Sequence, residues 1–419
     1  MFRIGIPKWI RAALIVLLLA FLVYRGLFPA FTQIDTDFPN YYTAGKVVVS
    51  GGEINRLYDD LWFQEQIKAN GMELKGKFSP FPPPTALLFV PFSIMTPLAA
   101  LQVMSVINLF LLAACVIVMG RILGIDRWDS LLLLLLGGIG LVNCFRFGQL
   151  YLVLSFTIIF GYYLYTHGKP VLAGIALGLF IPIKYFPIIF LIYFVMKGEW
   201  KVVAASSATA FVITIMSVLA MGWEIHELFI KTVLGQHLQS QLTLQDPYSS
   251  TFQSFDSLFR RLFMRDGTLN PHPVIDQPFF FHVLKFAAIA TVASISFVLV
   301  HRLTRGDRRF QGAAFGLLGI AGLLIAPATA TYHFILLWLP VGLLLRFFHE
   351  QSNRMAFWLT CAVYSAIGFI PYSLFRHFDG QGLWSLFAYP RLALIIGLFG
   401  ITTYYLGRGA LSPKTVHDP

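Results

Sequence analysis

The sequence predicts an all-α polytopic membrane protein with about twelve transmembrane helices and short extracytoplasmic helices at the membrane surface. Of its 419 residues, 57% are hydrophobic and only 12% are charged, whereas soluble domains carry about 25% charged residues. Apolar runs of roughly 20 residues, the length that crosses a bilayer as a helix, recur along the chain. Composition and run length together exclude an ordinary soluble domain.

The formal net charge of +11 raises the question of nucleic-acid binding. The lysines and arginines lie mostly in short segments between apolar runs and form no basic domain. We therefore expect contacts with the lipid bilayer and its anionic headgroups, and no nucleic acid. The three cysteines, Cys115, Cys144 and Cys361, show no CxxC spacing and predict neither a disulfide framework nor a zinc site.

The first span is expected at residues 12–28. Arg3, Lys8 and Arg11 precede or begin it, which places the N-terminus in the cytoplasm. Because no small-x-small cleavage pattern comes before Asp35, we interpret the span as uncleaved. The loop that follows then lies on the outer side of the membrane.

The first outer loop, residues 29–85, is too polar to cross the bilayer. Apolar residues at helical spacing predict surface helices over 41–49 and 57–67. The proline-rich stretch 78–84 cannot begin a regular helix until its end. The next span is therefore expected to start at Thr85.

Eleven further spans are predicted from the lengths of the apolar runs. They are expected near residues 86–119, 129–145, 149–166, 170–183, 185–196, 202–221, 282–301, 311–327, 332–346, 355–374 and 388–406. The two spans beside Lys184 are short and are interrupted by Pro182 and Pro187. Broken helices are tolerated where protein or a wet cavity satisfies the freed backbone groups, so this pair is expected to border a site.

Basic residues in the short loops indicate one orientation. The loops assigned to the cytoplasm hold Arg121, Arg127, Lys169, Lys197, Lys201, Arg302, Arg305, Arg308, Arg309, Arg346, Arg354, Arg408 and Lys414. The short outer loops hold only Arg146, Lys184 and Arg376. Both termini are therefore placed in the cytoplasm. For a bacterial source, the expected location is the inner membrane.

A second outer loop covers residues 222–281. Its segment 251–263 places apolar residues on one helical face, which predicts a helix packed on the membrane core; a substrate lid is the alternative. No internal repeat is detected, and residues 1–406 are interpreted as a single transmembrane domain. Residues 407–419 are expected to form a disordered cytoplasmic tail.

No aspartate or glutamate falls near the middle of a predicted span, which disfavours transport through a carboxylate relay. Candidate functional side chains gather instead at the outer face. They are Asp35, Asp37, Tyr41, Tyr42, Arg146, Gln149, Lys184, Gln253, Ser254, Tyr332 and His333. This distribution indicates an extracytoplasmic site at the membrane surface.

A series of short motifs accompanies these residues between positions 30 and 345. The series is Asp37-Phe38, Tyr41 to Ala44, Gly51-Gly52, Leu57 to Asp59, Phe81 to Pro84, Phe147-Gly148-Gln149, Ile183 to Pro187, Phe252 to Phe255 with Leu258 to Phe263, and Ala326-Pro327 through Tyr332-His333. In order and spacing the series resembles glycosyltransferase family 87. Phe81, Leu150 and Tyr185 depart from the commoner tyrosine, asparagine and proline of the family pattern.

The resemblance implies a membrane enzyme of the GT-C class that transfers a sugar, typically mannose, from a polyprenyl-phosphate sugar to a lipid or glycan acceptor. Asp37 falls on the motif. We expect it to take the proton from the acceptor hydroxyl, which attacks the anomeric carbon with inversion. Asp35 could instead be the base, or could orient Asp37 or the acceptor, and both acids could simply solvate the loop.

The leaving phosphate requires fixed positive charge. Lys184 is the first candidate, because a lysine between apolar runs is costly without a partner; snorkelling to the interface is the alternative. Arg146 and His333 are further candidates, with interfacial and purely structural roles as their alternatives. The expected substrate-binding set is completed by Tyr41, Tyr42, Gln149, Gln253, Ser254 and Tyr332.

The sequence is also compatible with other functions. A pentosyl transferase of the same class, such as an arabinofuranosyltransferase, fits the same chemistry. A nucleotide-sugar transferase would hold Mg²⁺ on a DxD motif, but Asp35-Thr36-Asp37 lies outside on the expected topology, so we expect no metal site and no cofactor. A lipid or polysaccharide transporter, or a structural membrane partner, would not need the outer acidic motif.

Overall fold

The computed structural model describes residues 7–239, 245–304 and 308–411. Within these residues every regular element is a helix, and strand-like pairing is limited to one isolated bridge between Asp266 and Asn270. The predicted all-α fold is confirmed. The predictions made for Arg3, for Arg305 and for the tail beyond residue 411 lie outside the described residues.

Six helical segments of the described chain are long and apolar enough to cross a membrane. They are Lys8–Thr32 (α1, Lys8–Leu22, with η1, Val23–Leu27, and α2, Phe28–Thr32), α6 (Pro97–Leu123), α12 (Trp200–Met221), α16 (Pro278–Thr304), Thr331–Glu350 (η5, Thr331–Leu337, with α18, Trp338–Glu350) and Pro390–Arg408 within α20 (Pro390–Leu411). The chain is therefore a polytopic membrane protein.

The predicted count of about twelve spans is not confirmed. The number of candidate spans rises from six to eight if two bent pairs each count as one span. These pairs are α7 (Arg127–Leu135) with α8 (Gly138–Arg146), and α19 (Arg354–Phe369) with η6 (Tyr372–Phe378). Shorter helices occupy several other predicted spans: α9 (Tyr151–Thr166), α10 (Pro170–Gly178), α11 (Ile188–Lys197) and α17 (Arg308–Ile325).

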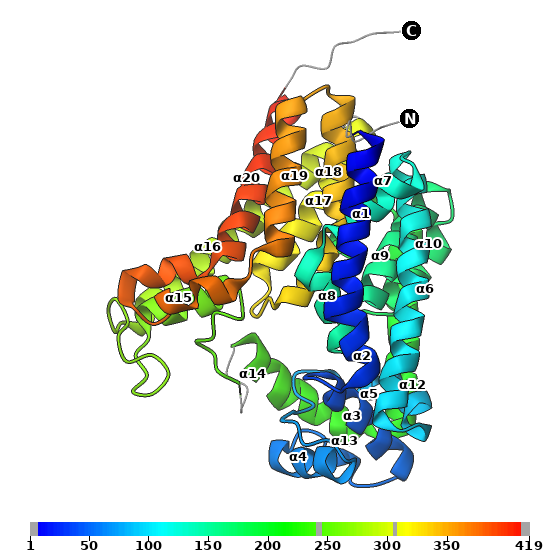
Figure 1. Cartoon of the computed structure of the whole chain (residues 1–419), viewed down its shortest axis with the longest axis vertical. Helices are drawn as coiled ribbons and strands as arrows, with labels where there is room; N and C mark the ends of the chain where they lie inside the picture. The colour runs from blue at the N-terminus through cyan, green and yellow to red at the C-terminus, as the bar shows by residue number, and fades with distance from the viewer. Residues whose placement is uncertain (1–6, 240–244, 305–307, 412–419) are drawn as a thin grey trace.

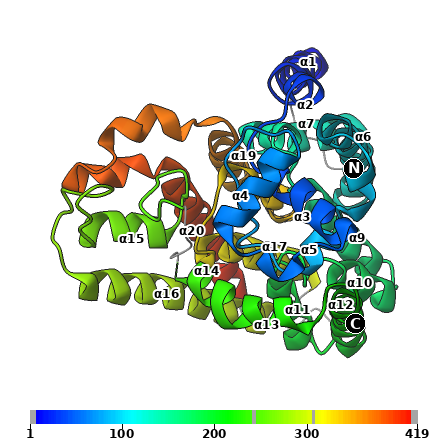
Figure 2. The same ribbon diagram turned by 90° about the horizontal axis from the view of Figure 1, so that it is seen from below.

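The two ends of the helix bundle differ in what they carry. The start of α1 and the end of α20 lie at the same end (Figure 1). At the opposite end lie α3 (Phe38–Ser50), α4 (Asp60–Ala69) and α13 (Trp223–Leu228), as Figures 1 and 2 show. The two helices predicted in the first loop are confirmed by α3 and α4. We call this end of the molecule the α3 end.

The second span begins later than predicted. After the prolines, the chain forms only the short helices α5 (Pro84–Leu87) and η3 (Val90–Ile94), and the long helix α6 starts at Pro97 rather than at Thr85. Pro91 lacks the amide N–H that a continuous helix needs. Thr96 then caps α6 through its side chain. The short helices α5 and η3 therefore pack beside α3, and the chain crosses the bundle only from Pro97 onward.

The predicted span 129–145 is bent instead of straight. The axes of α7 and α8 meet at 78°. Gly138 permits the bend, because its φ is +55° and a Cβ there would lie 2.3 Å from the carbonyl oxygen of Gly368. The end of α8 thereby reaches the start of α3, where Gly148 packs against Phe38.

The chain between α10 and α11 is irregular, as predicted. Residues 179–187 form no regular helix and contain Pro182 and Pro187. Thr85 donates a hydrogen bond to the carbonyl of Ile183 at 3.4 Å, which ties this segment to the start of α5. Lys184 is thus presented from a break between two helices.

The helix predicted over residues 251–263 is confirmed by α15 (Phe255–Phe263), which projects to one side of the bundle with η6 and η7 (Gly382–Ala388; Figures 1 and 2). Its charged side chains are buried. Asp256, 2% exposed, forms an ion pair with Arg260 of the same helix and another with Lys285 of α16 (Pro278–Thr304). The helix is therefore held to its neighbour by buried ion pairs as well as by its apolar face.

Candidate functional site

Asp37 lies in the turn between α2 and α3, directly before the first residue of α3. Its φ is +70°, a conformation that residues other than glycine rarely adopt and that costs about 1–3 kcal/mol. Although Asp37 occupies the N-cap position, its side chain makes no capping hydrogen bond. The carboxylate is left for other partners, and strained residues of this kind cluster at functional sites.

The turn at Gly148 brings Gln149 to this carboxylate. After α8 ends at Arg146, Gly148 adopts a φ of +57°, and a Cβ there would lie 2.6 Å from the Phe38 ring. Gln149, which is 1% exposed, donates from Nε2 to Oδ2 of Asp37 at 2.6 Å. Close packing between two segments far apart in the sequence therefore fixes one partner of Asp37.

A chain of hydrogen bonds connects Asp37 to Lys184. Nζ of Lys184 donates to the Tyr41 hydroxyl at 3.4 Å, and this hydroxyl donates to Oε1 of Gln149 at 2.8 Å. Because a carboxylate only accepts, Gln149 presents its amide N–H to Asp37 and its carbonyl oxygen to Tyr41. Every donor points from the ammonium toward the carboxylate, so the four side chains form one polar unit.

Lys184 is surrounded by aromatic rings. Its Nζ lies 4.2 Å from the ring centroid of Phe81, 5.1 Å from that of Tyr151 and 5.7 Å from that of Tyr41, all within the range of cation–π attraction. None of the ion pairs between described residues involves Lys184. A partly buried ammonium without a carboxylate in contact is suited to an anionic ligand.

Burial shifts the pKa values of both charged ends of this polar unit. It lowers the pKa of Lys184 to about 7, although the charge of Asp37 opposes the shift. It raises the pKa of Asp37, while the hydrogen bond from Gln149 and the charge of Lys184 act in the opposite direction. A carboxylate with a raised pKa is a stronger base toward a hydroxyl proton.

Asp35 and Arg146 are paired with each other. Nε of Arg146 donates to Oδ2 of Asp35 at 2.6 Å, and Asp35 also accepts from the backbone N–H of Thr36 at 2.8 Å. Both contacts engage the Asp35 carboxylate, and Arg146 already has a carboxylate partner. They favour Asp37 over Asp35 as a base, and Lys184 over Arg146 as a partner for an incoming anion.

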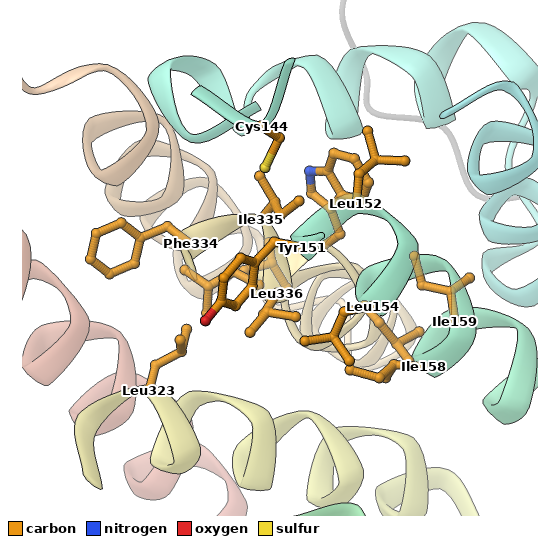
Figure 3. Close-up of a cluster of buried hydrophobic side chains, with 14 of the residues drawn as sticks. Cys144, Tyr151, Leu152, Leu154, Ile158, Ile159, Leu323, Phe334, Ile335 and Leu336 are labelled. Atoms are coloured by element: carbon orange, nitrogen blue, oxygen red, sulfur yellow. The ribbon is translucent and has the colours of Figure 1, made fainter. Parts of the chain in front are cut away.

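Tyr332 and His333 lie in η5 and pack on Tyr151, the first residue of α9. Nε2 of His333 lies 2.5 Å from the Tyr151 hydroxyl, and the ring centroids of Tyr151 and Tyr332 are 5.2 Å apart. Figure 3 shows Tyr151 among buried side chains, with its hydroxyl on the side away from Cys144. Because the Tyr151 ring also contacts Lys184, the Tyr-His pair joins the same site.

Three residues of the expected substrate-binding set are engaged elsewhere. Tyr42 donates to the carbonyl of Met95 at 2.7 Å. Gln253, 1% exposed, donates to the carbonyl of Ala388 at 3.1 Å, and Ser254 caps α15 through its side chain. These hydrogen bonds stabilise the loops around the site and occupy polar atoms that a substrate would otherwise contact.

Tyr151 belongs to the site but was not predicted from the sequence, and two further basic residues, Lys77 and His237, lie within electrostatic reach of Lys184. Burial, together with the positive charges of Lys184 and Lys77, lowers the pKa of His237 to about 4, so the three basic groups lie within electrostatic reach of each other. His237 sits in α14 (Leu234–Leu238), inside the long second loop, where no local motif marks it. Tyr151 could have been found, because it follows Gln149 by two positions.

The acidic triplet of the first loop does not present two carboxylates to a common ligand. Asp35 is paired with Arg146, whereas Asp37 accepts from Gln149. Across the part of the chain that the structure describes, no group of three or more histidine, cysteine, aspartate or glutamate residues is arranged to hold a metal ion. The pair of acids therefore offers no ready metal-binding geometry.

Gly148→Ala is expected to lower both stability and activity. The added Cβ would clash with the Phe38 ring and strain a positive φ, which costs about 1–3 kcal/mol and displaces Gln149 from Asp37. Thermal unfolding of the purified variant measures the loss of stability, and its initial rate measures the loss of activity. Gly168→Ala is the matched control, because Gly168 has a φ of +72° and a Cβ there would have no neighbouring atom within 4 Å. Equal losses in the two variants would show that packing at Phe38 does not position Gln149.

The family model described as Glycosyltransferase family 87 matches residues 80–327, which is more than half of the chain. The matched region holds Gln149 and Lys184, while Asp35 and Asp37 precede it. No curated protein matches the chain.

Proposed function

Because the chain belongs to glycosyltransferase family 87 and is a membrane glycosyltransferase, we propose that it transfers a hexose, mannose, from a polyprenyl-phosphate sugar to a lipid or glycan acceptor. In this proposal the configuration at the anomeric carbon inverts and Asp37 is the base. The site faces the extracytoplasmic side of the inner membrane, and both termini are cytoplasmic.

The observation that carries the proposal is the polar unit of Lys184, Tyr41, Gln149 and Asp37. It places a positive charge and a basic carboxylate at the two ends of one set of hydrogen bonds. Transfer from a glycosyl phosphate needs both: a cation where the phosphate leaves, and a base where the acceptor loses its proton.

The reaction assigns one task to each end of this unit. The Asp37 carboxylate takes the proton of the acceptor hydroxyl while the hydroxyl oxygen forms a bond to the anomeric carbon. The bond from that carbon to the phosphate oxygen breaks, and polyprenyl phosphate leaves with the electron pair. Lys184 stabilises the negative charge that develops on the phosphate. No general acid is required, because the phosphate is stable as an anion.

A lipid-linked donor suits the position of Lys184. The residue lies in an irregular segment between two apolar helices, α10 and α11, where a polyprenyl chain can remain in the bilayer while its phosphate meets the ammonium. The excess of basic residues in the loops assigned to the cytoplasm supports placing the α3 end outside. The helices α3 and α4 at this end, and α15 at the side of the bundle, are proposed to shape the acceptor groove.

The test is transfer of radiolabelled mannose from polyprenyl-phosphate-mannose to a total lipid extract by the purified protein, with EDTA present. Labelled product that forms in EDTA is the expected result. GDP-mannose with Mg²⁺ and a polyprenyl-phosphate pentose serve as alternative donors. Product from GDP-mannose alone would contradict the proposed donor class, and product from the pentose alone would replace mannose by a pentose.

The pH dependence of kcat/KM for the donor is expected to be bell-shaped. Activity should rise as Asp37 loses its proton, above the ordinary range of an aspartate because its pKa is raised. It should fall as Lys184 loses its charge near pH 7, since only the ammonium attracts the phosphate. The phosphodiester of the donor does not titrate in this range. In Lys184→Arg the upper limb should move beyond pH 9, because arginine stays charged; an unchanged limb would assign it to another group.

A further inference from the structure

The backbone of Ala330 selects the tautomer of His333. The amide N–H of Ala330 donates to Nδ1 of His333 at 3.0 Å, and the carbonyl oxygen of Ala330 lies 3.1 Å from the same nitrogen. The amide nitrogen always carries its proton, so a second proton on Nδ1 would face it directly. The contact with the amide N–H favours the neutral tautomer in which Nδ1 accepts and Nε2 carries the proton.

This tautomer determines which way the Tyr151 hydroxyl points its own proton. Nε2–H of His333 donates to the Tyr151 oxygen across 2.5 Å, so the hydroxyl proton is not used in that contact. Tyr41 differs, because its hydroxyl donates to Gln149. The Tyr151 hydroxyl makes no other hydrogen bond with the described residues, and its proton is available to a ligand.

The Tyr151 ring stands beside the ammonium of Lys184, at 5.1 Å from Nζ to the ring centroid. Figure 3 shows the hydroxyl directed away from Cys144, toward the region between Phe334 and Leu323. A hydroxyl proton that has no acceptor among the described residues, next to a cation without an ion-pair partner among them, is satisfied only when an acceptor arrives.

We propose that Tyr151 binds the donor phosphate, donating its hydroxyl proton to a phosphate oxygen beside Lys184, and that His333 positions Tyr151 instead of contacting the phosphate. This inference rests on the proposed function, because it takes polyprenyl phosphate as the ligand. It changes the role expected for His333 and adds a residue that the sequence motifs did not include.

Kinetics of four variants test the assignment. Tyr151→Phe should lower kcat/KM for polyprenyl-phosphate-mannose by roughly 10- to 100-fold, the range for losing a hydrogen bond to a charged group, mainly through a higher KM. Tyr162→Phe, also buried in α9, should leave the kinetics unchanged. His333→Leu should lower kcat/KM, whereas His333→Gln, which keeps an N–H donor near the Nε2 position, should retain most of it.

The double variant separates positioning from direct contact. If His333 acts only through Tyr151, His333→Leu should cause no further loss in the Tyr151→Phe background. Independent, multiplicative losses would mean that His333 itself contacts the donor, and would overturn the proposal. Wild-type kinetics without any transfer from polyprenyl-phosphate-mannose would instead reject the proposed function.

The tautomer can be measured without any activity. In protein labelled with ¹⁵N-histidine, the His333 signals, identified by their loss in His333→Gln, should show a protonated Nε2 and an unprotonated Nδ1 near neutral pH. A protonated Nδ1 would turn the Tyr151 proton toward His333 and overturn the inference, whether or not the donor class is correct.

Discussion

Asp37→Asn is expected to lower sugar transfer by about 10²–10⁴-fold, the range for loss of a positioned general base. Asparagine can accept the hydrogen bond from Gln149, and it tolerates a positive φ almost as well as aspartate does. The variant therefore removes the charge and basicity of residue 37 while preserving its backbone. Initial rates with saturating donor and acceptor measure the effect, which should appear in kcat.

Asp35→Asn provides the comparison within the same triplet. Its loss should be less than about tenfold, because Asp35 is paired with Arg146 and its removal breaks a partly exposed ion pair. A deeper loss in Asp35→Asn than in Asp37→Asn would transfer the role of base to Asp35. Full activity in both variants would show that neither acid is the base.

Lys184→Ala should lower kcat/KM for the donor by about 10²–10³-fold, comparable to removing one stabilising group from a developing oxyanion. The structure gives two reasons. Lys184 has no ion-pair partner among the described residues, so its charge is available to phosphate, and Phe81 with Tyr151 holds it in place. Both the affinity for the donor and the turnover should fall.

Lys231→Ala is the matched control for this lysine. Lys231 lies in η4 (Phe229–Val233) next to α14, is 72% exposed and pairs with Glu227. Removing it deletes one positive charge without touching the polar unit. Losses of similar size in both variants would mean that general electrostatic attraction, rather than a specific contact at Lys184, accounts for the effect.

The sequence predicted the parts of the fold that depend on local pattern. Helical spacing of apolar residues identified α3, α4 and α15, and the prolines beside Lys184 identified the break between α10 and α11. The bend at Gly138 and the late start of α6 at Pro97 were not predicted. Apolar runs have similar composition whether they cross the bundle in one helix or turn within it, so run length alone could not separate these cases.

The candidate site was predicted as a set of residues but not as a set of contacts. Sequence order placed Asp37, Gln149 and Lys184 in motifs, yet it could not show that Tyr41 links them, because the link depends on packing between α3 and the end of α8. The polar residues Gln253 and Ser254 looked equally suitable. Only their hydrogen bonds to backbone groups distinguish a structural role from contact with a substrate.

Binding of polyprenyl phosphate to three purified proteins tests the central claim most directly, because the claim divides the polar unit into a phosphate-binding end and a basic end. The measurement is thermal stabilisation by the lipid in detergent, for wild type, Asp37→Asn and Lys184→Ala. We expect Asp37→Asn to be stabilised at least as much as wild type while remaining inactive, and Lys184→Ala to lose the stabilisation. Equal stabilisation of wild type and Lys184→Ala would contradict the account.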